Sequence, residues 1–271
     1  MTSSSSKGTA LVTGASSGIG AVYADRLAKR GYDLILVARN EGRLKALAER
    51  LKRETGRTVD VLVADLNKAS DVRRVEAVLK DDKRISVLVN NAGVGAVTPL
   101  LQSDIAKMEE MIDLNVTALT RLTYAAAPAF VARGAGTIIN IASIVGVAPE
   151  MLNGVYGATK AYVVALSQSL QHELADKGVR IQAVLPGATA TEFWDVAGYP
   201  HTNMPKAIVM SAEDMVDASL AGLDAGEVIT IPALPDQDEW NRYEAARRAM
   251  STRLSSEHAA PRYKLLERVA S

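Results

Sequence analysis

A tyrosine, a lysine and a serine are the residues of this sequence best suited to proton transfer. Tyr156 and Lys160 stand four positions apart, and Ser143 lies a short way upstream. On a helix, residues at this spacing share one face, so the ammonium would lie beside the phenol. A free phenol has a pKa of about 10, and a neighbouring cation lowers that pKa. The trio predicts a general acid or base, Tyr156, which Lys160 tunes, while Ser143 hydrogen-bonds the reacting oxygen.

A glycine-rich turn near the N-terminus predicts a site for a nucleotide pyrophosphate. The turn lies between the first expected strand and the first expected helix. Glycines there permit a tight turn, a close approach of backbone to phosphate, and close packing of helix on strand. The helix N-terminus adds free N–H groups and the positive end of its dipole. The candidate cofactor-binding residues of the turn are Gly14, Ser16, Ser17, Gly18, Ile19 and Gly20.

Short apolar runs alternate with longer amphipathic stretches along the chain. The apolar runs are typical of strands buried on both faces, and they cover residues 10–12, 34–37, 59–63, 87–89, 137–141, 180–184 and 228–231. The expected helices cover residues 18–30, 41–55, 68–81, 104–131, 154–177 and 211–225. This alternation predicts an α/β fold, a Rossmann-type doubly wound parallel sheet of seven strands with helices on both faces.

The ordered set of motifs resembles the classical short-chain dehydrogenase/reductase family over residues 9–232. The motifs are Thr13 to Gly20, Asp65, Asn90-Asn91-Ala92-Gly93, Asn115, Ser143, Tyr156 with Lys160, and Pro186-Gly187. The glycine spacing is Gly-x-x-x-Gly-x-Gly, not the Gly-x-Gly-x-x-Gly of most dinucleotide folds. The resemblance implies an oxidoreductase that interconverts a carbonyl and an alcohol by hydride transfer. Its catalytic residues would be Asn115, Ser143, Tyr156 and Lys160.

The resemblance also implies roles for residues at the ends of the expected strands. Asn115 would bind a water that continues the proton relay, and Lys160 would hold the nicotinamide ribose. Asp65 and Leu66 would bind the adenine. The adenine ribose side would be lined by Asn91, Ala92 and Gly93, and the nicotinamide carboxamide would be held by the turn with Pro186, Gly187, Thr189 and Thr191.

The end of the second expected strand discriminates between two dinucleotides. An acidic residue about 20 residues after the glycines usually binds the ribose of NAD, but this chain has Ala38-Arg39-Asn40. The fork of donors on Arg39 suits a 2′-phosphate. We therefore expect NADP (NADPH) as the preferred cofactor, with NAD as a weaker alternative. Many NADP-dependent relatives carry a second basic residue where this chain has Ser17, so the preference is expected to be moderate.

Residues 192–210, EFWDVAGYPHTNMPKAIVM, form a segment of unusual composition. Aromatic residues and methionines gather there, and Lys206 is the only cation. A mobile flap of this kind would exclude water from the site and favours an apolar or aromatic carbonyl substrate. The alternative is that the same residues only pin the segment to the body. The candidate substrate contacts are Ser143, Val145, Phe193, Trp194 and Tyr199.

Composition excludes several other classes. Basic and acidic residues balance at 31 each, so no global field favours nucleic acid. The three histidines are far apart and cysteine is absent, so no metal site is expected. No apolar run is long enough to span a bilayer, and a cytoplasmic location is expected. Apolar residues on more than one face of the two long helices predict a homodimer or homotetramer; examples are Leu119, Leu122, Ala126, Phe130, Val163, Leu166 and Leu170.

The expected organisation is a flexible segment 1–8, a domain over 9–235, and a helical extension of that domain over 236–271, with a helix at 236–256. Three other functions stay open. One is a 3-oxoacyl-thioester reductase of the same family. Another is a nucleotide-sugar epimerase or dehydratase, which the glycine spacing and chain length disfavour. The third is an NADP-binding regulatory protein without turnover, which the complete catalytic set disfavours.

Overall fold

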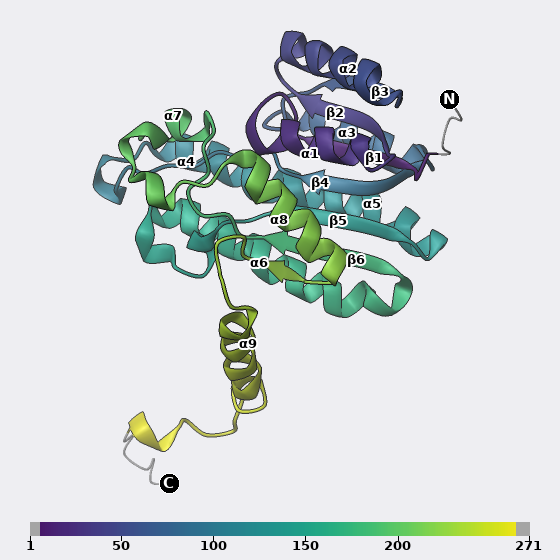
Figure 1. The fold of residues 1–271 in the computed structure, drawn as a ribbon. Coiled ribbons are helices and arrows are strands. Elements are labelled where there is room, and N and C mark those ends of the chain that lie inside the picture. Colours follow the sequence, from purple (N-terminus) through teal and green to yellow (C-terminus); the bar gives the residue numbers. More distant parts are fainter. Residues whose placement is uncertain (1–5, 264–271) are drawn as a thin grey trace. The chain divides into compact units, whose positions relative to one another are not determined.

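Seven parallel strands form one sheet within residues 6–263, the part of the chain that the structure, a computed structural model, describes (Figure 1). The spatial order is β3-β2-β1-β4-β5-β6-β7, so the order reverses between β1 and β4. Ligands of such sheets bind beside the carboxyl ends of the strands at this reversal. The predicted doubly wound fold is confirmed. The strands are β1 Thr9–Thr13, β2 Asp33–Ala38, β3 Val59–Val63, β4 Ile85–Asn90, β5 Gly136–Ile141, β6 Val179–Val184 and β7 Ile229–Thr230.

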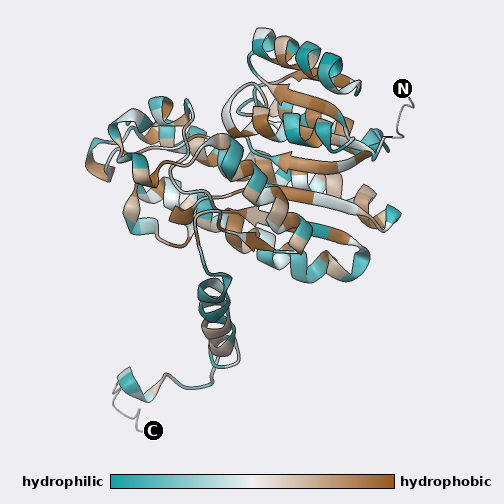
Figure 2. Cartoon of the chain, viewed as in Figure 1, coloured by the Kyte–Doolittle hydropathy of each residue, from teal (hydrophilic) through white to brown (hydrophobic). Residues whose placement is uncertain are grey.

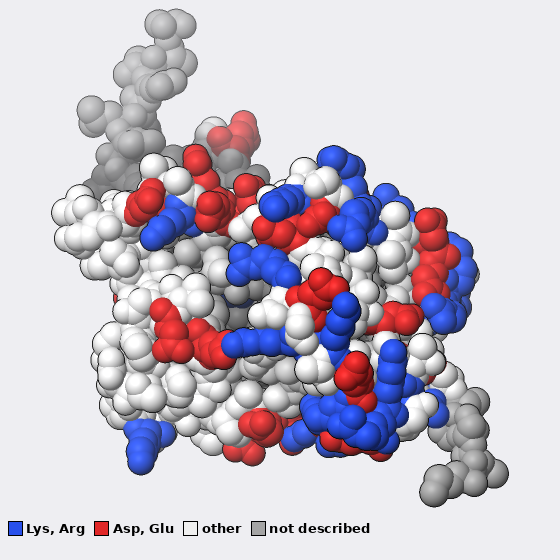
Figure 3. Space-filling view, turned by 90° about the horizontal axis from the view of Figure 1, so that it is seen from above, with Lys and Arg blue, Asp and Glu red and all other residues white. Residues whose placement is uncertain are grey.

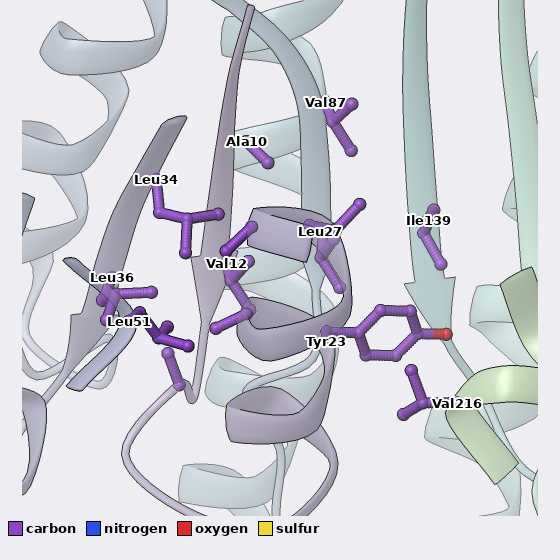
Figure 4. Close-up of a cluster of buried hydrophobic side chains, with 14 of the residues drawn as sticks. Ala10, Val12, Tyr23, Leu27, Leu34, Leu36, Leu51, Val87, Ile139 and Val216 are labelled. Atoms are coloured by element: carbon purple, nitrogen blue, oxygen red, sulfur yellow. The ribbon is translucent and has the colours of Figure 1, made fainter. Parts of the chain in front are cut away.

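Helices cover both faces of the sheet, and each face has its own apolar cluster beneath its helices. One cluster lies under α1 Gly18–Lys29, α2 Glu41–Thr55 and α8 Ala212–Ala225; the other lies under α3 Ala69–Asp81, α5 Leu119–Arg133 and α6 Gly154–Leu174. Successive strand residues point to opposite faces, so Val12 joins the first cluster and Leu11 the second. Figure 4 shows Tyr23 of α1 in the first cluster, and Figure 2 shows the strands to be mostly hydrophobic.

The predicted helix 104–131 is helical throughout, over residues 105–133, but it is not α-helical throughout. Its two parts, α4 Ile105–Ile112 and α5 Leu119–Arg133, are joined by a wide π-helical turn, Asp113–Ala118. A π turn keeps the chain helical, so the apolar pattern continues through it and hides it. Such turns are found frequently at functional sites, and this one contains Asn115.

The loops at the carboxyl ends of the strands carry most of the short elements. Those after β4 and β5 include the 3₁₀ turns Leu100–Gln102, Ile144–Gly146 and Pro149–Met151, and those after β6 include α7 Phe193–Ala197, His201–Asn203 and Lys206–Ile208. Figure 1 places α4 and α7 beyond the same ends of the strands. The Val97 N–H donates to the Ala197 oxygen at 3.4 Å, so the loop after β4 meets the segment after β6.

The chain divides into two compact units, residues 1–232 and 233–271. The second contains α9 Gln237–Ser251, the helix predicted at 236–256, and a 3₁₀ turn Pro261–Tyr263. That 236–271 extend the first domain stays a prediction. Of the expected flexible segment 1–8, residues 1–5 lie outside the described residues, as do residues 264–271 at the other end. The Lys7 N–H donates to the Gly31 oxygen at 3.1 Å and the Gly8 oxygen accepts from Asp33 at 3.0 Å, so residues 7 and 8 are already held.

None of the helices described in residues 6–263 combines the length and hydropathy that a membrane crossing needs.

Candidate active site

Tyr156 lies near the start of α6, and a helix cap fixes its position. The Asn153 side chain accepts hydrogen bonds from the N–H groups of Val155 at 2.9 Å and Tyr156 at 3.3 Å, as asparagine does at an N-cap. The Tyr156 ring is buried, and so is Ser143. Burial raises the pKa of Tyr156 to about 12, and the interaction of its hydroxyl with Ser143 opposes that rise. The phenol is therefore protonated at neutral pH.

Lys160 lies one helical turn further along α6 and is also buried. Its Nζ donates to the oxygen of Ile141, the last residue of β5, at 2.9 Å and lies 5.9 Å from the centre of the Tyr156 ring. Burial lowers the pKa of Lys160 to about 8. The predicted lowering of the Tyr156 pKa by Lys160 is not found. Burial dominates because it removes both groups from water and disfavours the charged form of each.

Ser143 follows β5 directly and begins the turn Ile144–Gly146. Its Oγ accepts from the Val145 N–H and donates to the Pro186 oxygen, both at 3.4 Å. These long bonds and the contact with Tyr156 hold the hydroxyl beside the phenol. Ser143 and Tyr156, with Lys160 behind them, thus come together as the sequence predicts. A carbonyl oxygen that reached the two hydroxyls would meet two hydrogen-bond donors.

Asn115 stands in the π turn, and its amide is used within the protein. Oδ1 accepts from the Val94 N–H at 3.0 Å, while Nδ2 donates to the Val94 oxygen at 2.8 Å and to Thr159 Oγ1 at 3.1 Å. The amide therefore ties the loop after β4 to α6, close to Tyr156. The implied water-binding role stays a prediction, and it would fall to the backbone of Asn115 because the side chain is engaged.

The glycine-rich turn fits a dinucleotide pyrophosphate. Gly14 and Gly18 have φ of 64° and 51°, angles that residues with a side chain rarely adopt. A Cβ on Gly20 would overlap the Gly14 oxygen. Ser17 begins α1 without a side-chain cap, and the first turn of α1 has no acidic residue. The helix can therefore offer its first N–H groups and its positive dipole end to an anion.

The other predicted cofactor residues lie at the same edge of the sheet. Arg39 follows β2 with an exposed side chain, and within residues 6–263 no ion pair is formed by it. Asp65 and Leu66 follow β3, while Pro186, Gly187, Thr189 and Thr191 follow β6. Residues Asn91 to Gly93 follow β4, but the Asn91 amide donates to the oxygens of Thr13 at 2.9 Å and Gly14 at 3.2 Å. Asn91 therefore supports the glycine-rich turn, and a ribose contact from its amide would require those bonds to open.

Segment 192–210 contributes unequally to the site. Phe193 packs on Tyr156, with ring centres 5.9 Å apart. Trp194 is buried, and its Nε1 donates to the Thr189 oxygen at 3.0 Å. Tyr199 is exposed, and its hydroxyl donates to the Asn203 oxygen at 3.3 Å. Phe193 thus packs against Tyr156, Trp194 pins the segment to the body, and Tyr199 does neither. That the segment is a mobile flap over the substrate stays a prediction.

Three apolar residues that the sequence analysis did not identify, Ala96, Met108 and Met111, complete the site. Val145 and Tyr156 are buried with Ala96, Met108 and Met111 in one cluster, against which Phe193 packs. Gly95 leaves room for that ring, because a Cβ there would overlap the Phe193 side chain. The signal in the sequence is the run of small residues from Gly93 to Ala96 directly after a buried strand.

Comparison with known proteins shows which family has this arrangement of residues. The family model for short chain dehydrogenases matches residues 8–198. The chain belongs to the short-chain dehydrogenase/reductase family. Within it, the chain is similar to the solved short-chain dehydrogenase from Sphingobium yanoikuyae in complex with NADPH. The two are 48% identical with a TM-score of 0.92, over 94% of this chain and 99% of the other.

Two further members of the family are similar over most of the chain. The bulky-bulky ketone specific alcohol dehydrogenase from Comamonas testosteroni is 44% identical with a TM-score of 0.88, over 96% of this chain and 99% of the other. Sulfoacetaldehyde reductase 2 from Chromohalobacter salexigens is 39% identical over 186 residues, which are 68% of this chain and 73% of that protein.

Proposed function

We propose that this short-chain dehydrogenase/reductase reduces ketones with bulky apolar substituents, using NADPH, and reoxidises the alcohols in reverse. The observation that carries the proposal is the buried pair Ser143 and Tyr156 placed against the apolar side chains of Val145 and Phe193. These apolar side chains fit substrate substituents without charge. Support also comes from the Comamonas testosteroni relative, which acts on bulky-bulky ketones.

The residues of this chain provide the proton chemistry. When bound, NADPH supplies the hydride for the carbonyl carbon. Tyr156, kept protonated by burial, donates its proton to the carbonyl oxygen, and Ser143 stabilises that oxygen as charge develops on it. Lys160, anchored on Ile141, places a positive charge near the phenolate that remains. Phe193 covers Tyr156 and excludes water.

The proposed function is tested by following NADPH oxidation over ketones graded by the size of both substituents. The panel includes steroids, aryl ketones, aliphatic aldehydes and 3-oxoacyl thioesters. Preference for ketones with two large substituents supports the proposal. Preference for the thioesters would favour the alternative 3-oxoacyl-thioester reductase, and no turnover with any of them would favour a regulatory NADP-binding protein.

Phe193→Ala is expected to lower kcat/KM for bulky apolar ketones by about 10- to 200-fold, the range for a lost apolar contact in a pocket. The ring packs on Tyr156, so its loss opens the site at the reacting group. Small ketones should be affected less because they do not reach the ring. The measurement is kcat/KM across the panel, with a thermal melt of each variant. Trp194→Ala is the comparison, since Trp194 pins the segment and its loss should chiefly lower the melting temperature. Equal losses for small and bulky ketones would contradict a substrate contact by Phe193.

For the cofactor, we propose NADP with NAD as the weaker alternative. Arg39 at the end of β2 is exposed and forms no ion pair with another of the described residues 6–263, so it suits the 2′-phosphate. The Sphingobium yanoikuyae relative was solved with NADPH. Asp65 and Leu66 would hold the adenine, and the turn from Pro186 to Thr191 would hold the nicotinamide end.

Arg39→Asp is expected to shift the preference from NADPH toward NADH. The change removes a partner of the phosphate and supplies an acceptor for the ribose hydroxyls. The ratio of kcat/KM for the two cofactors measures the shift. Arg53→Asp, at an exposed position in the last turn of α2, controls for the change in net charge. A ratio that stays at the parental value would place the phosphate contact elsewhere.

We also propose that the protein is a homodimer or homotetramer and that it is cytoplasmic. The residues that support the oligomer differ from those named in the sequence analysis. Most of the residues predicted to face a partner are buried within the chain: Leu119, Leu122, Ala126, Phe130, Val163 and Leu170 are at most 8% exposed. Leu166 is half-buried. The surfaces of the helices instead expose Ile112, Tyr124 and Tyr162. Exposed large apolar groups of this kind favour contact with a second copy.

A further inference from the structure

An ion pair joins the two ends of the proposed cofactor site. Arg43 lies in the first turn of α2, whose N-cap, Asn40, accepts a hydrogen bond from the Arg43 N–H at 3.0 Å. Glu192 directly follows Thr191 and begins segment 192–210. Nη1 of Arg43 donates to Glu192 Oε2 at 2.6 Å, and Nη2 donates to Oε1 at 3.2 Å. Two parallel hydrogen bonds fix the direction of the contact as well as its strength.

This pair closes a ring around the glycine-rich turn. Arg43 belongs to the loop and helix after β2, and Glu192 to the segment after β6; in the sheet, β1, β4 and β5 lie between these strands. A Cβ on Gly18 would contact the Thr191 methyl group at 3.1 Å, so the residue before Glu192 already lies against the turn. The loop proposed for the adenosine end therefore meets the loop proposed for the nicotinamide end across the pyrophosphate site.

We propose that the Arg43–Glu192 pair is a strap across the bound dinucleotide, which must open each time the cofactor enters or leaves. This inference rests on the NADP site proposed above. Because Glu192 begins the segment that carries Phe193, the strap also couples cofactor exchange to the residue that covers Tyr156.

The strength of the pair suits a contact that opens in every turnover. The side chains of Arg43 and Glu192 are 49% and 59% exposed, so water and salt screen their attraction. Acidic and basic side chains are mixed over the surface seen in Figure 3, and a test must therefore separate this pair from its neighbours. Glu41–Lys45, at 2.6 Å on the same helix, offers a matched pair that does not join two loops.

The test measures the dissociation rate of NADPH from the full-length protein by stopped-flow fluorescence, with excess NADP⁺ as the chase. Glu192→Gln should release NADPH about 1.4- to 5-fold faster, the range for loss of one exposed ion pair. Raising the salt concentration should speed release from the parent toward the rate of the variant. The charge-swapped double variant, Arg43→Glu with Glu192→Arg, should restore slow release, while Glu41→Gln should release at the parental rate.

Each other outcome overturns the strap in a recognisable way. A parental rate in Glu192→Gln, or fast release that persists in the charge-swapped variant, would show that the pair does not hold the cofactor. A change in release rate that is confined to NADPH and absent with NADH would assign Arg43 to the 2′-phosphate instead. If the parent bound neither dinucleotide, the proposed cofactor would fail together with the strap, whereas tight binding with unchanged rates would overturn the strap alone.

Discussion

Tyr156→Phe is expected to abolish turnover while NADPH still binds. The variant keeps the α6 ring that packs on Phe193 and loses only the hydroxyl that interacts with Ser143. General acid catalysis by a positioned side chain contributes about 10²- to 10⁴-fold, so the rate of ketone reduction should fall by at least that range. The measurements are single-turnover ketone reduction and NADPH affinity by fluorescence titration.

Tyr162→Phe is the matched control for this variant. It removes a phenol hydroxyl from the same helix, one that hydrogen-bonds Thr120 at 2.9 Å on the exposed side. It should keep parental turnover. If Tyr156→Phe retained turnover within about tenfold of the parent, short of the 10²-fold minimum for a general acid, Tyr156 would not be the proton donor. A loss of NADPH affinity as large as the loss of rate would indicate that the phenol serves binding instead.

Lys160→Met is expected to abolish turnover and at the same time stabilise the fold at neutral pH. Lys160 is buried, and burial lowers its pKa from 10.5 to about 8. At pH 7 the folded protein therefore carries a desolvated charge, at a cost on the order of 3 kcal/mol for a shift of this size. Methionine fills a similar volume without that charge. It leaves the Ile141 oxygen without its donor, which offsets part of the gain.

The stabilisation expected for Lys160→Met depends on pH, and the pKa of Lys160 determines the direction of that dependence. Below the folded pKa of about 8, both the folded and the unfolded protein hold the Lys160 proton, and the full cost is present. Between that value and 10.5 the unfolded chain binds more protons, so the parent gains stability as the pH rises. The advantage of Lys160→Met in melting temperature should therefore be largest at pH 7 and shrink on approaching 10.5. Lys52→Met, on α2, controls for the loss of a lysine, and an advantage that did not change with pH would contradict the assigned cause.

The fold could be predicted from the sequence because most strands are buried on both faces and each covering helix has one apolar face. The pairing of Tyr156 with Lys160 followed from spacing alone. What spacing could not supply was the degree of burial, since it depends on segments far away in the chain. Burial reverses the expected effect on the Tyr156 pKa, and it hides Leu122 and Phe130 from any partner.

Two other features of the site escaped prediction for geometric reasons. The π turn at Asp113–Ala118 adds to a helical turn without breaking the apolar pattern, so periodicity does not reveal it. The contact of Phe193 with Gly95 joins two loops that share no sequence pattern. Only the ends of β4 and β6, at one edge of the sheet, bring these residues together.

The position of Trp194 makes it an intrinsic fluorescent probe of cofactor binding. The chain has two tryptophans, and Trp194 is fixed by its bond to the Thr189 oxygen, beside Phe193 and the carboxamide-binding turn proposed here. The other, Trp240, belongs to the unit 233–271. With Trp240 replaced by phenylalanine, the remaining indole would transfer excitation energy to a reduced nicotinamide bound nearby. Its quenching would report cofactor arrival in real time, with no attached dye.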